Sequence, residues 1–383
     1  MKFLEHIAIN PEVKLIKGNI YPFIDMASVS TKSREPDHIG EKVFTSGIKF
    51  QKGDTVIARI EPCLQNGKRF YCKNIEKGFG STEYLVFRPK DKKINNLYLY
   101  YFMQQDFIKQ KMIKSMSGAT GRQRVNNAVF NELEISLPPL ETQQKIASIL
   151  SAYDDLIENN RRQIKLLEEA AQRLYEEWFV DLRFPGHENV KVIDGVPEGW
   201  EKKSMEEIAD YLNGFAFKPS DWGTIGRPII KIKELNEGIT KNTPRNTGED
   251  IPSKYYISSG DLIFSWSATL TAKIWDAEDG ILNQHLFKVT PHAGIAREYL
   301  LQSILYTLKE FQNLTTGSTM KHIQRGKLSQ VFVKVPADEI MKRYNKSVDN
   351  IREKILSSNH MVTFLQEARD RLLPKLMSGE IKV

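Results

Sequence analysis

Two long stretches of the chain carry apolar residues at alternating intervals of four and three. In the first stretch these positions are Ile146, Leu150, Tyr153, Ile157, Asn160, Ile164, Leu167, Ala171, Leu174 and Trp178. This spacing is that of a coiled-coil seam, in which one stripe of a helix packs against a second helix. Asn160 breaks the apolar stripe, and one buried polar residue can fix the register of a helix pair. The pattern predicts a long helix with a partner.

The second stretch repeats the first at an offset of 198 residues. Its seam positions are Tyr344, Val348, Ile351, Ile355, Ser358, Val362, Leu365, Arg369, Leu372 and Leu376. Polar Ser358 stands where Asn160 stands in the first seam. Arg369 departs from the apolar pattern, and we expect the neighbouring Ala368 to point inward in its place.

Each seam runs roughly 40 residues, which corresponds to about 60 Å of helix. A compact domain of about 140 residues is only roughly 30 Å across, so most of such a helix must project from its domain. The alternative is one amphipathic helix packed on its own domain. We favour two projecting helices that bury their seams against each other. Because an internal pseudo-twofold relates the copies, we expect the pair to be antiparallel.

The segments before the two seams also resemble each other. Five pairs of short segments match in the same order, at offsets that drift between 199 and 207: 4–8 with 205–209, 21–26 with 227–232, 53–57 with 260–264, 84–89 with 286–291, and 117–120 with 316–319. Insertions and deletions in loops produce such drift without breaking the core. The chain is therefore predicted to be a tandem repeat.

These patterns predict an α+β protein with two globular domains, each followed by a long helix. We expect a first domain over 1–140, a long helix over 141–182, a linker over 183–201, a second domain over 202–337, and a second helix with a tail over 338–383. Within the first domain we expect strands around 21–26, 54–59, 68–72 and 83–88. A helix over 95–115, a loop over 116–125 and a closing strand near 131–136 should follow.

Charge is distributed unevenly along the chain, whose formal net charge is +7. Residues 1–140 carry 22 Lys or Arg against 14 Asp or Glu, whereas residues 141–182 carry 5 against 9. A basic first domain suggests an acidic partner. The sequence shows neither a membrane-length apolar run nor a signal peptide, so we expect a cytoplasmic protein with no membrane partner. Cys63 and Cys72 are interpreted as reduced packing residues.

Known catalytic motifs are missing from the sequence. It contains neither a phosphate-binding GxxxxGK[ST] loop nor an HExxH zinc helix. The seven His are scattered without metal-ligand spacing, and the Pro138-Pro139 pair reads as a stop before a helix rather than as part of a methyltransferase motif. We expect no metal, no cofactor and no catalysis in this chain.

Polar loops at equivalent positions of the two copies are candidate DNA contacts. In the first copy the loop after the 95–115 helix offers Thr120, Arg122, Gln123 and Arg124. Its counterpart offers Thr319, Lys321, His322, Gln324 and Arg325. Arg pairs bidentately with guanine, and Gln pairs so with adenine. The alternative is a helix-ending turn with solvated charges, and we favour DNA because both copies are dense in such residues.

Two further clusters could contact DNA or could be plain surface, and the sequence leaves both interpretations open. One contains Arg59, Gln65, Asn66, Lys68 and Arg69, and its counterpart Ser265 and Ser267 is shorter and uncharged. The other contains Lys32 and Arg34, matched by Lys241 and Arg245 in the second copy.

With these features in view, the chain resembles the specificity (S) subunit of type I restriction–modification systems. The resemblance rests on the Gly53-Asp54 turn, the Gly-Ala-Thr and Gly-Ser-Thr loops, the string Leu-Pro-Pro-Leu-Glu-Thr-Gln-Gln-Lys-Ile-Ala over 137–147, and Val-Pro-Glu-Gly-Trp-Glu over 196–201. It covers nearly the whole chain. The second copy departs from the family pattern where Val335-Pro336-Ala337-Asp338-Glu339 replaces the fuller Pro-Pro-Leu-Glu string.

The resemblance implies two target-recognition domains, each of which reads one half of a split site in double-stranded DNA. The helices would form an antiparallel coiled coil that sets the spacing of the half-sites and docks two modification subunits. Those subunits carry S-adenosylmethionine and methylate adenine, and restriction subunits with translocase activity join the full complex. The S subunit itself would only recognise the target sequence and set the spacing of its half-sites.

Three other functions would also suit parts of this sequence. A repressor-like protein would bind DNA tightly without a protein partner, and a coiled-coil scaffold would not bind DNA at all. A nuclease acting alone would cleave DNA in a metal-dependent reaction. Salt separates the scaffold from the DNA readers, because affinity for DNA falls steeply with salt as phosphate contacts are screened.

Overall fold

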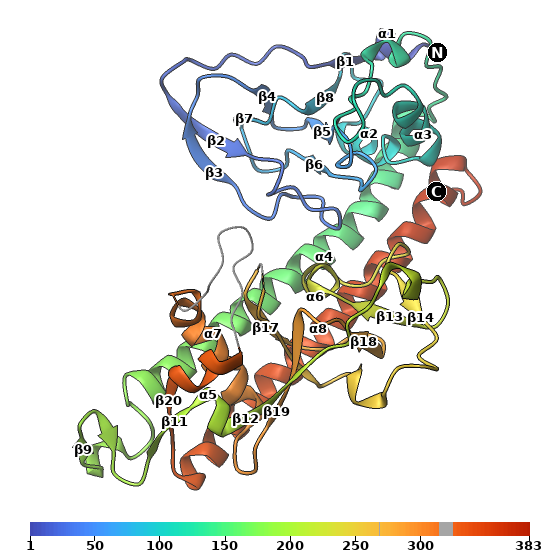
Figure 1. The fold of residues 1–383 in the computed structure, drawn as a ribbon. Coiled ribbons are helices and arrows are strands. Elements are labelled where there is room, and N and C mark those ends of the chain that lie inside the picture. The colour runs from blue at the N-terminus through green and yellow to red at the C-terminus, as the bar shows by residue number, and fades with distance from the viewer. Residues whose placement is uncertain (268, 314–324) are drawn as a thin grey trace. The chain divides into compact units, whose positions relative to one another are not determined.

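The computed structural model describes residues 1–267, 269–313 and 325–383 (Figure 1). The chain divides into two compact units. Unit 1 comprises Met1–Gln163 together with Ser358–Val383, and unit 2 comprises Ile164–Ser357. Both unit boundaries fall inside long helices, so each unit contains one globular domain, part of the first long helix and part of the second.

Unit 1 is built on two four-stranded sheets. The first has the order β1 (Ile7–Ile9), β8 (Tyr84–Pro89), β5 (Thr55–Ala58) and β6 (Arg69–Tyr71), and its neighbours all pair antiparallel. The second has the order β3 (Gly40–Val43), β2 (Ile20–Ile24), β7 (Lys77–Gly80) and β4 (Ile48–Gln51), with β2 and β7 parallel. All four residues of β5 are buried, so its apolar residues Val56, Ile57 and Ala58 follow one another without polar alternation.

Unit 2 repeats this topology strand for strand. Its antiparallel sheet has the order β12 (Ala209–Asn213), β19 (Leu286–Pro291), β16 (Leu262–Ser265) and β17 (Thr271–Ile274). Its mixed sheet has the order β14 (Arg245–Asn246), β13 (Arg227–Ile230), β18 (Gly280–Leu282) and β15 (Tyr256–Ile257), with β13 and β18 parallel. The prediction of an α+β tandem repeat is confirmed.

Shorter elements complete the two units. Two small ladders pair β9 (Val192–Ile193) with β10 (Val196–Pro197), and β11 (Glu201–Ser204) with β20 (Phe332–Val335). The short helices are α1 (Phe3–His6), α5 (Met205–Ile208) and α6 (Ile232–Glu237). Single 3-10 turns cover Asn127–Phe130, His187–Asn189, Pro219–Asp221, Ser253–Tyr255 and Arg325–Gln330.

The Gly-Asp pairs that the two copies share are turns before a central strand. Gly53 has a φ of 85°, and its counterpart has a φ of 98°, a region that favours glycine. The Asp54 carboxylate accepts a hydrogen bond from the backbone N–H three residues earlier and pairs with Arg88 at 2.6 Å. Asp261 accepts the equivalent backbone bond and pairs with Lys288 at 2.7 Å. The shared motif is therefore structural, because it ties the turn to the neighbouring strand.

The helical region of the first domain differs from its prediction. The structure has two helices, α2 (Asn96–Phe102) and α3 (Asp106–Lys114), where the sequence suggested one over 95–115. Gln105 is extended (φ −62°, ψ 140°), and the N–H groups of Gln104 and Gln105 bond to carbonyls three residues back. The equivalent helix of unit 2, α7 (Arg297–Asn313), is continuous. The closing strand near 131–136 is reduced to an isolated bridge between Lys2 and Glu134.

The long helices are α4 (Leu140–Tyr175), which continues as a π-helical turn over Glu176–Val180, and α8 (Asp338–Ser378). At the start of α4, the buried side chain of Gln143 donates to the carbonyl oxygens of Lys93 and Pro138 and accepts from the N–H of Asn95. This glutamine belongs to the Pro-Pro-Leu-Glu-x-Gln string, so the string anchors the helix to its domain. Buried Met341 takes its place in the second copy.

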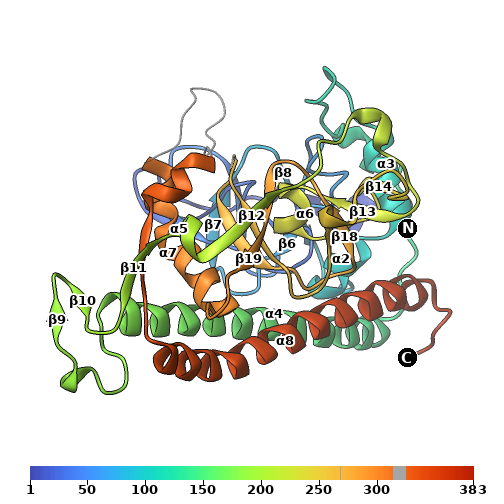
Figure 2. The same ribbon diagram turned by 60° about the horizontal axis from the view of Figure 1, so that its bottom comes forward.

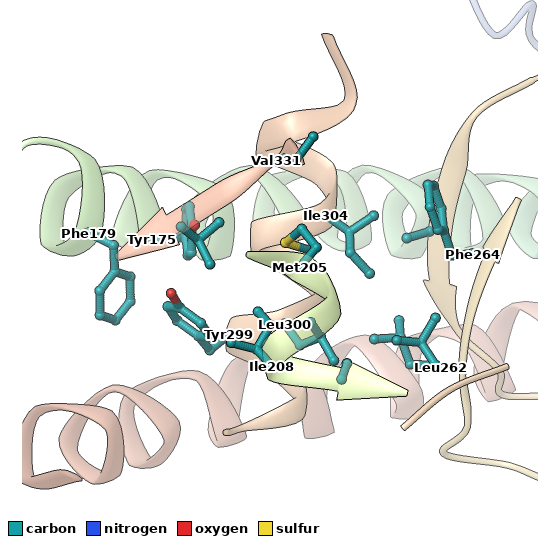
Figure 3. Close-up of a cluster of buried hydrophobic side chains, with 14 of the residues drawn as sticks. Tyr175, Phe179, Met205, Ile208, Leu262, Phe264, Tyr299, Leu300, Ile304 and Val331 are labelled. Atoms are coloured by element: carbon teal, nitrogen blue, oxygen red, sulfur yellow. The ribbon is translucent and has the colours of Figure 1, made fainter. Parts of the chain in front are cut away.

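Apolar contacts bind the ends of the long helices to their domains. In unit 1, Ile146 and Leu150 of α4 share a buried cluster with Leu376 of α8 and with residues of α2 and α3. In unit 2 the ring of Phe179 lies 4.9 Å from that of Tyr299 on α7 and 4.8 Å from that of Tyr344 on α8. Figure 3 shows Phe179 and Tyr175 beside Tyr299 in this cluster.

Burial along α4 and α8 follows the predicted seams. Leu150 and Ile157 on α4 and Val348, Ser358, Val362 and Leu365 on α8 are buried. The other positions predicted for the interface are half-buried: Tyr153, Asn160, Ile164, Leu167, Ile351 and Ile355. The amide of Asn160 donates to the Leu156 carbonyl of its own helix, a local bond of 2.8 Å.

The expectation for Arg369 is wrong. Arg369 itself, at 7% exposure, takes the inward position, and Ala368 is half-buried. Its guanidinium donates to the buried carboxylate of Asp154 on α4 at 2.5 Å. The second oxygen of Asp154 accepts from the Tyr101 hydroxyl of α2 at 2.6 Å. Asp154 thus joins α2, α4 and α8 inside unit 1.

Replacing Arg369 tests this junction. We expect R369L to lower the free energy of unfolding by about 3–5 kcal/mol, because it leaves the buried Asp154 carboxylate without its cation. Urea unfolding followed by circular dichroism measures the change. R371L is the matched control, since Arg371 is exposed and its ion pair with Glu367 spans 3.8 Å. The triple variant Y101F/D154L/R369L removes every polar member and should recover most of the loss; equal effects of R369L and R371L would refute the junction.

Candidate nucleic-acid interface

Two of the polar clusters in the first domain lie against each other. The loop over 117–125 folds back on itself, with paired backbone hydrogen bonds between Ser117 and Arg124. It also bonds to the segment after β5, where Glu61 N donates to Gln123 O, and Val125 N donates to Arg59 O. We name the residues 59–69 and 117–125, together with Glu83, the reading surface. In Figure 2 the loop after α3 projects from the side of its domain that faces away from α4.

The loop over 117–125 presents its polar residues to solvent unequally. Thr120 and Arg122 are exposed, and Gln123 is half-buried. Arg124 is held by Glu83, whose carboxylate accepts three hydrogen bonds of 2.7–3.0 Å from the guanidinium. These hydrogen bonds raise the pKa of Arg124. Both arginines of the loop are exposed, and the guanidinium of Arg124 is oriented by its bonds to Glu83.

Most polar side chains of 59–69 are engaged with their own domain. Arg59 donates to the Val125 carbonyl, Lys68 to the Met26 carbonyl, and Arg69 to Gly67 and to the Gln104 side chain. The Gln65 amide lies 3.4 Å from a Glu61 carboxylate oxygen. Asn66 is exposed at the tip of the turn. These bonds hold the segment in one shape, and they leave Asn66 as its most accessible polar residue.

Arg34 requires a correction, because it is not a surface residue. It is 2% exposed, and its guanidinium donates to Asp155 at 2.6 Å and to Glu158 at 2.7 Å, both on α4. Burial by itself would lower the pKa of Arg34, but the two carboxylates raise it above the ordinary value. Lys32 is half-buried, and its carbonyl accepts from the Gln366 side chain of α8. This cluster fastens the domain to its helices.

The second-copy candidates in unit 2 are divided in the same way. Lys241 is exposed, whereas Arg245 pairs with Glu278 at 2.5 Å and donates to the Gly226 carbonyl. The interpretation of Ser265 and Ser267 as candidate DNA contacts is wrong, since both are buried and the Ser265 hydroxyl donates to the Ser267 carbonyl. They belong to the end of β16 and to the chain that follows it, so they support the sheet.

The remaining candidates of the second copy are Thr319, Lys321, His322 and Gln324, and they lie outside the described residues. Arg325 begins the 3-10 turn Arg325–Gln330. Their role in DNA binding stays a prediction from the sequence.

Two acidic residues at the reading surface were not predicted from the sequence. Glu83 and Glu61 both contact the loop over 117–125, Glu83 through Arg124 and Glu61 through the Gly121 N–H at 3.1 Å. Isolated carboxylates in loops have no spacing signal. Their negative charge is also opposite to that of the residues that bind phosphate, so charge did not indicate them either.

Within the described residues, no helix is both long and apolar enough to cross a membrane. In the same part of the chain, no three His, Cys, Asp or Glu side chains gather as a metal site would require. Cys72 is buried and Cys63 half-buried, and both are free thiols.

Comparison with known proteins gives consistent matches to one family. The family model described as "Type I restriction modification DNA specificity domain" matches twice, at residues 8–169 and 197–359. The type I restriction enzyme MjaIX specificity subunit of Methanocaldococcus jannaschii is 27% identical over 315 residues, which cover 77% of this chain and 71% of that protein. The HindI specificity subunit of Haemophilus influenzae is 26% identical and covers 86% and 87%.

A solved structure agrees at the level of the fold. The crystal structure of a type I restriction–modification system S subunit from M. genitalium aligns with a TM-score of 0.55 at 16% identity, covering 98% of this chain and 95% of that one. The two matches of the family model correspond to the two copies of the paired sheets described above.

Replacing Arg34 tests whether this residue stabilises the fold or contacts DNA. We expect R34M to lower the free energy of unfolding by about 2–3 kcal/mol, because two charge-assisted hydrogen bonds to α4 are lost. Urea unfolding measures the effect, and R122M, at an exposed arginine of the same domain, should leave unfolding unchanged. If R34M unfolded like the wild type and instead lost affinity for DNA, Arg34 would be a DNA contact and its structural role would be refuted.

Proposed function

This chain belongs to the type I restriction modification DNA specificity family, and from that premise we propose that it is the non-catalytic, sequence-reading subunit of a type I restriction–modification complex. The observation that carries the proposal is the duplication. Two domains with the same pair of four-stranded sheets stand in one chain, and each coincides with one match to the family model. Each domain would read one half of a bipartite target in double-stranded DNA.

In the first domain, the reading surface would make the DNA contacts. Arg122 and Gln123 are of the types that pair with guanine and adenine, and Arg122 is exposed on a loop whose glycines Gly118 and Gly121 have positive φ. Asn66 lies at the tip of the adjoining turn. In the second domain, exposed Lys241 and the sequence 319–325 would have the corresponding task.

The long helices would pair as an antiparallel coiled coil that sets the distance between the half-sites. The support is the burial along both seams, together with contacts in each unit. Asp154 of α4 pairs with Arg369 of α8. Phe179, in the π-helical turn that continues α4, packs its ring against that of Tyr344 on α8. Half-sites about one helical turn of DNA apart, roughly 34–36 Å, face the same side of the duplex.

The partners in this proposal are two modification subunits and the restriction subunits of the full complex, in the cytoplasm. The relatives from M. jannaschii and H. influenzae are named as specificity subunits of type I restriction enzymes, which is the support for this part. S-adenosylmethionine would be bound by the modification subunits and not by this chain.

Methylated DNA tests the function directly. The chain is co-expressed with the modification subunit encoded beside it, in a host that lacks adenine methylation, and the genome is sequenced for modified adenines. We expect one split motif of two short half-sites at a fixed gap. The modification subunit expressed alone is the control and should give no motif. Assembly of the complex without any motif would contradict the reading function and favour the scaffold.

Removing one heptad from both long helices tests the spacing role. Seven residues keep each seam in phase, so the helices can still pair while the strut shortens by roughly 10 Å. We expect the spacer of the methylated motif to shorten while both half-sites keep their sequences. A variant with the deletion in α4 alone misaligns the helices and should abolish methylation. Altered half-sites with an unchanged spacer would refute the proposal that the helices set the spacing.

A further inference from the structure

The carboxylates of the reading surface form an arrangement that DNA binding alone does not explain. Phosphates repel carboxylates, so a surface that only attracted DNA would gain from losing Glu83 and Glu61. On the basis of the proposed function, we propose that these two residues are positioning residues, which hold the loop over 117–125 in the one shape that reads its half-site. We call the two carboxylates and their contacts with this loop the clamp, and Arg124 is the loop residue that Glu83 holds.

Glu83 is well placed to be the fixed end of the clamp. It directly precedes β8, its carbonyl accepts from the Arg59 N–H at 2.8 Å, and its own N–H donates to the Ser81 hydroxyl at 3.1 Å. Its side chain is 21% exposed, against 49% for Arg124. A carboxylate fixed at the start of an interior strand therefore holds a guanidinium that belongs to a loop.

The contact between Glu83 and Arg124 is directional. Arg124 Nε lies 2.8 and 3.0 Å from the two carboxylate oxygens, and its terminal nitrogen lies 2.7 Å from one of them. Such planar bidentate pairing fixes the orientation of the guanidinium as well as its position. The bonds to Glu83 engage Nε and one terminal nitrogen of Arg124, so this edge of the guanidinium is occupied and cannot at the same time pair with guanine. Arg122, two residues away, is exposed and has the reading role.

Glu61 fixes the opposite side of the same loop. One of its oxygens accepts from the Gly121 N–H at 3.1 Å, and its own backbone N–H donates to the Gln123 carbonyl at 2.9 Å. Gly121 has a φ of 78°, a conformation that other residues rarely adopt. The two bonds bracket Arg122 on both sides, so Glu61 and Glu83 together determine where that side chain leaves the backbone.

A loop that is ordered before binding need not lose its freedom when DNA arrives. Base recognition also requires donors at defined positions on the base edge, whereas phosphate attraction tolerates displacement. The clamp therefore acts on discrimination between sequences more than on overall affinity. Loss of the clamp should therefore lower discrimination between sequences, whereas loss of a negative charge alone should only tighten binding to DNA.

The test compares E83Q with E76Q in the complex of the full chain and its modification subunit. Glu76 makes an exposed pair with Lys52, so both variants remove one negative charge from the same domain. The probes are a duplex with the methylated motif and two duplexes in which one half-site or the other is scrambled. Affinities are measured at one salt concentration by fluorescence anisotropy, and unfolding is recorded for every variant.

We expect E83Q to reduce discrimination by about tenfold at one half-site and to leave the other half-site as in the wild type. Binding to the duplex scrambled in the affected half-site should be unchanged or tighter, because a negative charge is gone. A smaller folded fraction would weaken binding to all duplexes equally, so it cannot produce this pattern. E76Q should leave both discrimination ratios unchanged.

R124Q and the double variant E83Q/R124Q complete the comparison. If Glu83 acts by holding Arg124, R124Q loses the same discrimination as E83Q, and the double variant loses no more than either single one. Additive losses, or an E83Q variant that behaves like E76Q, would overturn the proposal while the reading function stands. A wild-type complex that binds all three duplexes equally would instead refute the reading function, and the clamp with it.

Discussion

A carboxylate buried in the interior of a protein is costly unless it is paired, and unit 1 is organised around such a group. Asp154 is 1% exposed, and its two oxygens are satisfied by Arg369 of α8 and by Tyr101 of α2. The domain, the first long helix and the last helix of the chain must therefore all be in place for this group to be stable. Arg34 repeats the principle nearby, since it is a buried cation neutralised by two carboxylates of α4. Charged residues thus fasten the first domain to its helices.

The second unit has the same architecture with different polar chemistry. At the offset of 198 that relates the helices, Arg352 replaces Asp154, and Ala171 replaces Arg369. Arg352 lies 3.3 Å from the carboxylate of Glu298 on α7, so here the long helix carries the cation and the domain the carboxylate, the reverse of Arg34 and its two α4 carboxylates. Burial raises the pKa of Glu298, against the effect of Arg352. The duplication has therefore conserved the topology of the sheets while the contacts that join domain and helix have diverged.

The long-range organisation could be predicted because it depends on periodicity. Heptad spacing and short matched segments survive in the sequence, and they located both helices and the tandem repeat. The contacts of single charged side chains could not be predicted, since the sequence shows the sign of a charge but not its burial. Arg34 and Arg122 are both arginines in polar loops, yet one is buried against α4 and the other is exposed. Likewise Ser265 and Ser267 have the composition of loop residues, whereas the structure buries both at the end of β16 and just after it.

The division of both long helices between the units has a consequence for biosynthesis. Asp154 and Arg369 are 215 residues apart along the chain. At about 5–20 residues per second, a ribosome needs roughly 10–40 s to make the intervening segment. During that interval the apolar stripe of α4 around Ile146 and Leu150 has no α8 to cover it. Of the two domains, the one before α4 is synthesised earlier and yet is completed only by α8, so a nascent chain of this protein passes through a prolonged stage at which it is open to aggregation and to capture by chaperones.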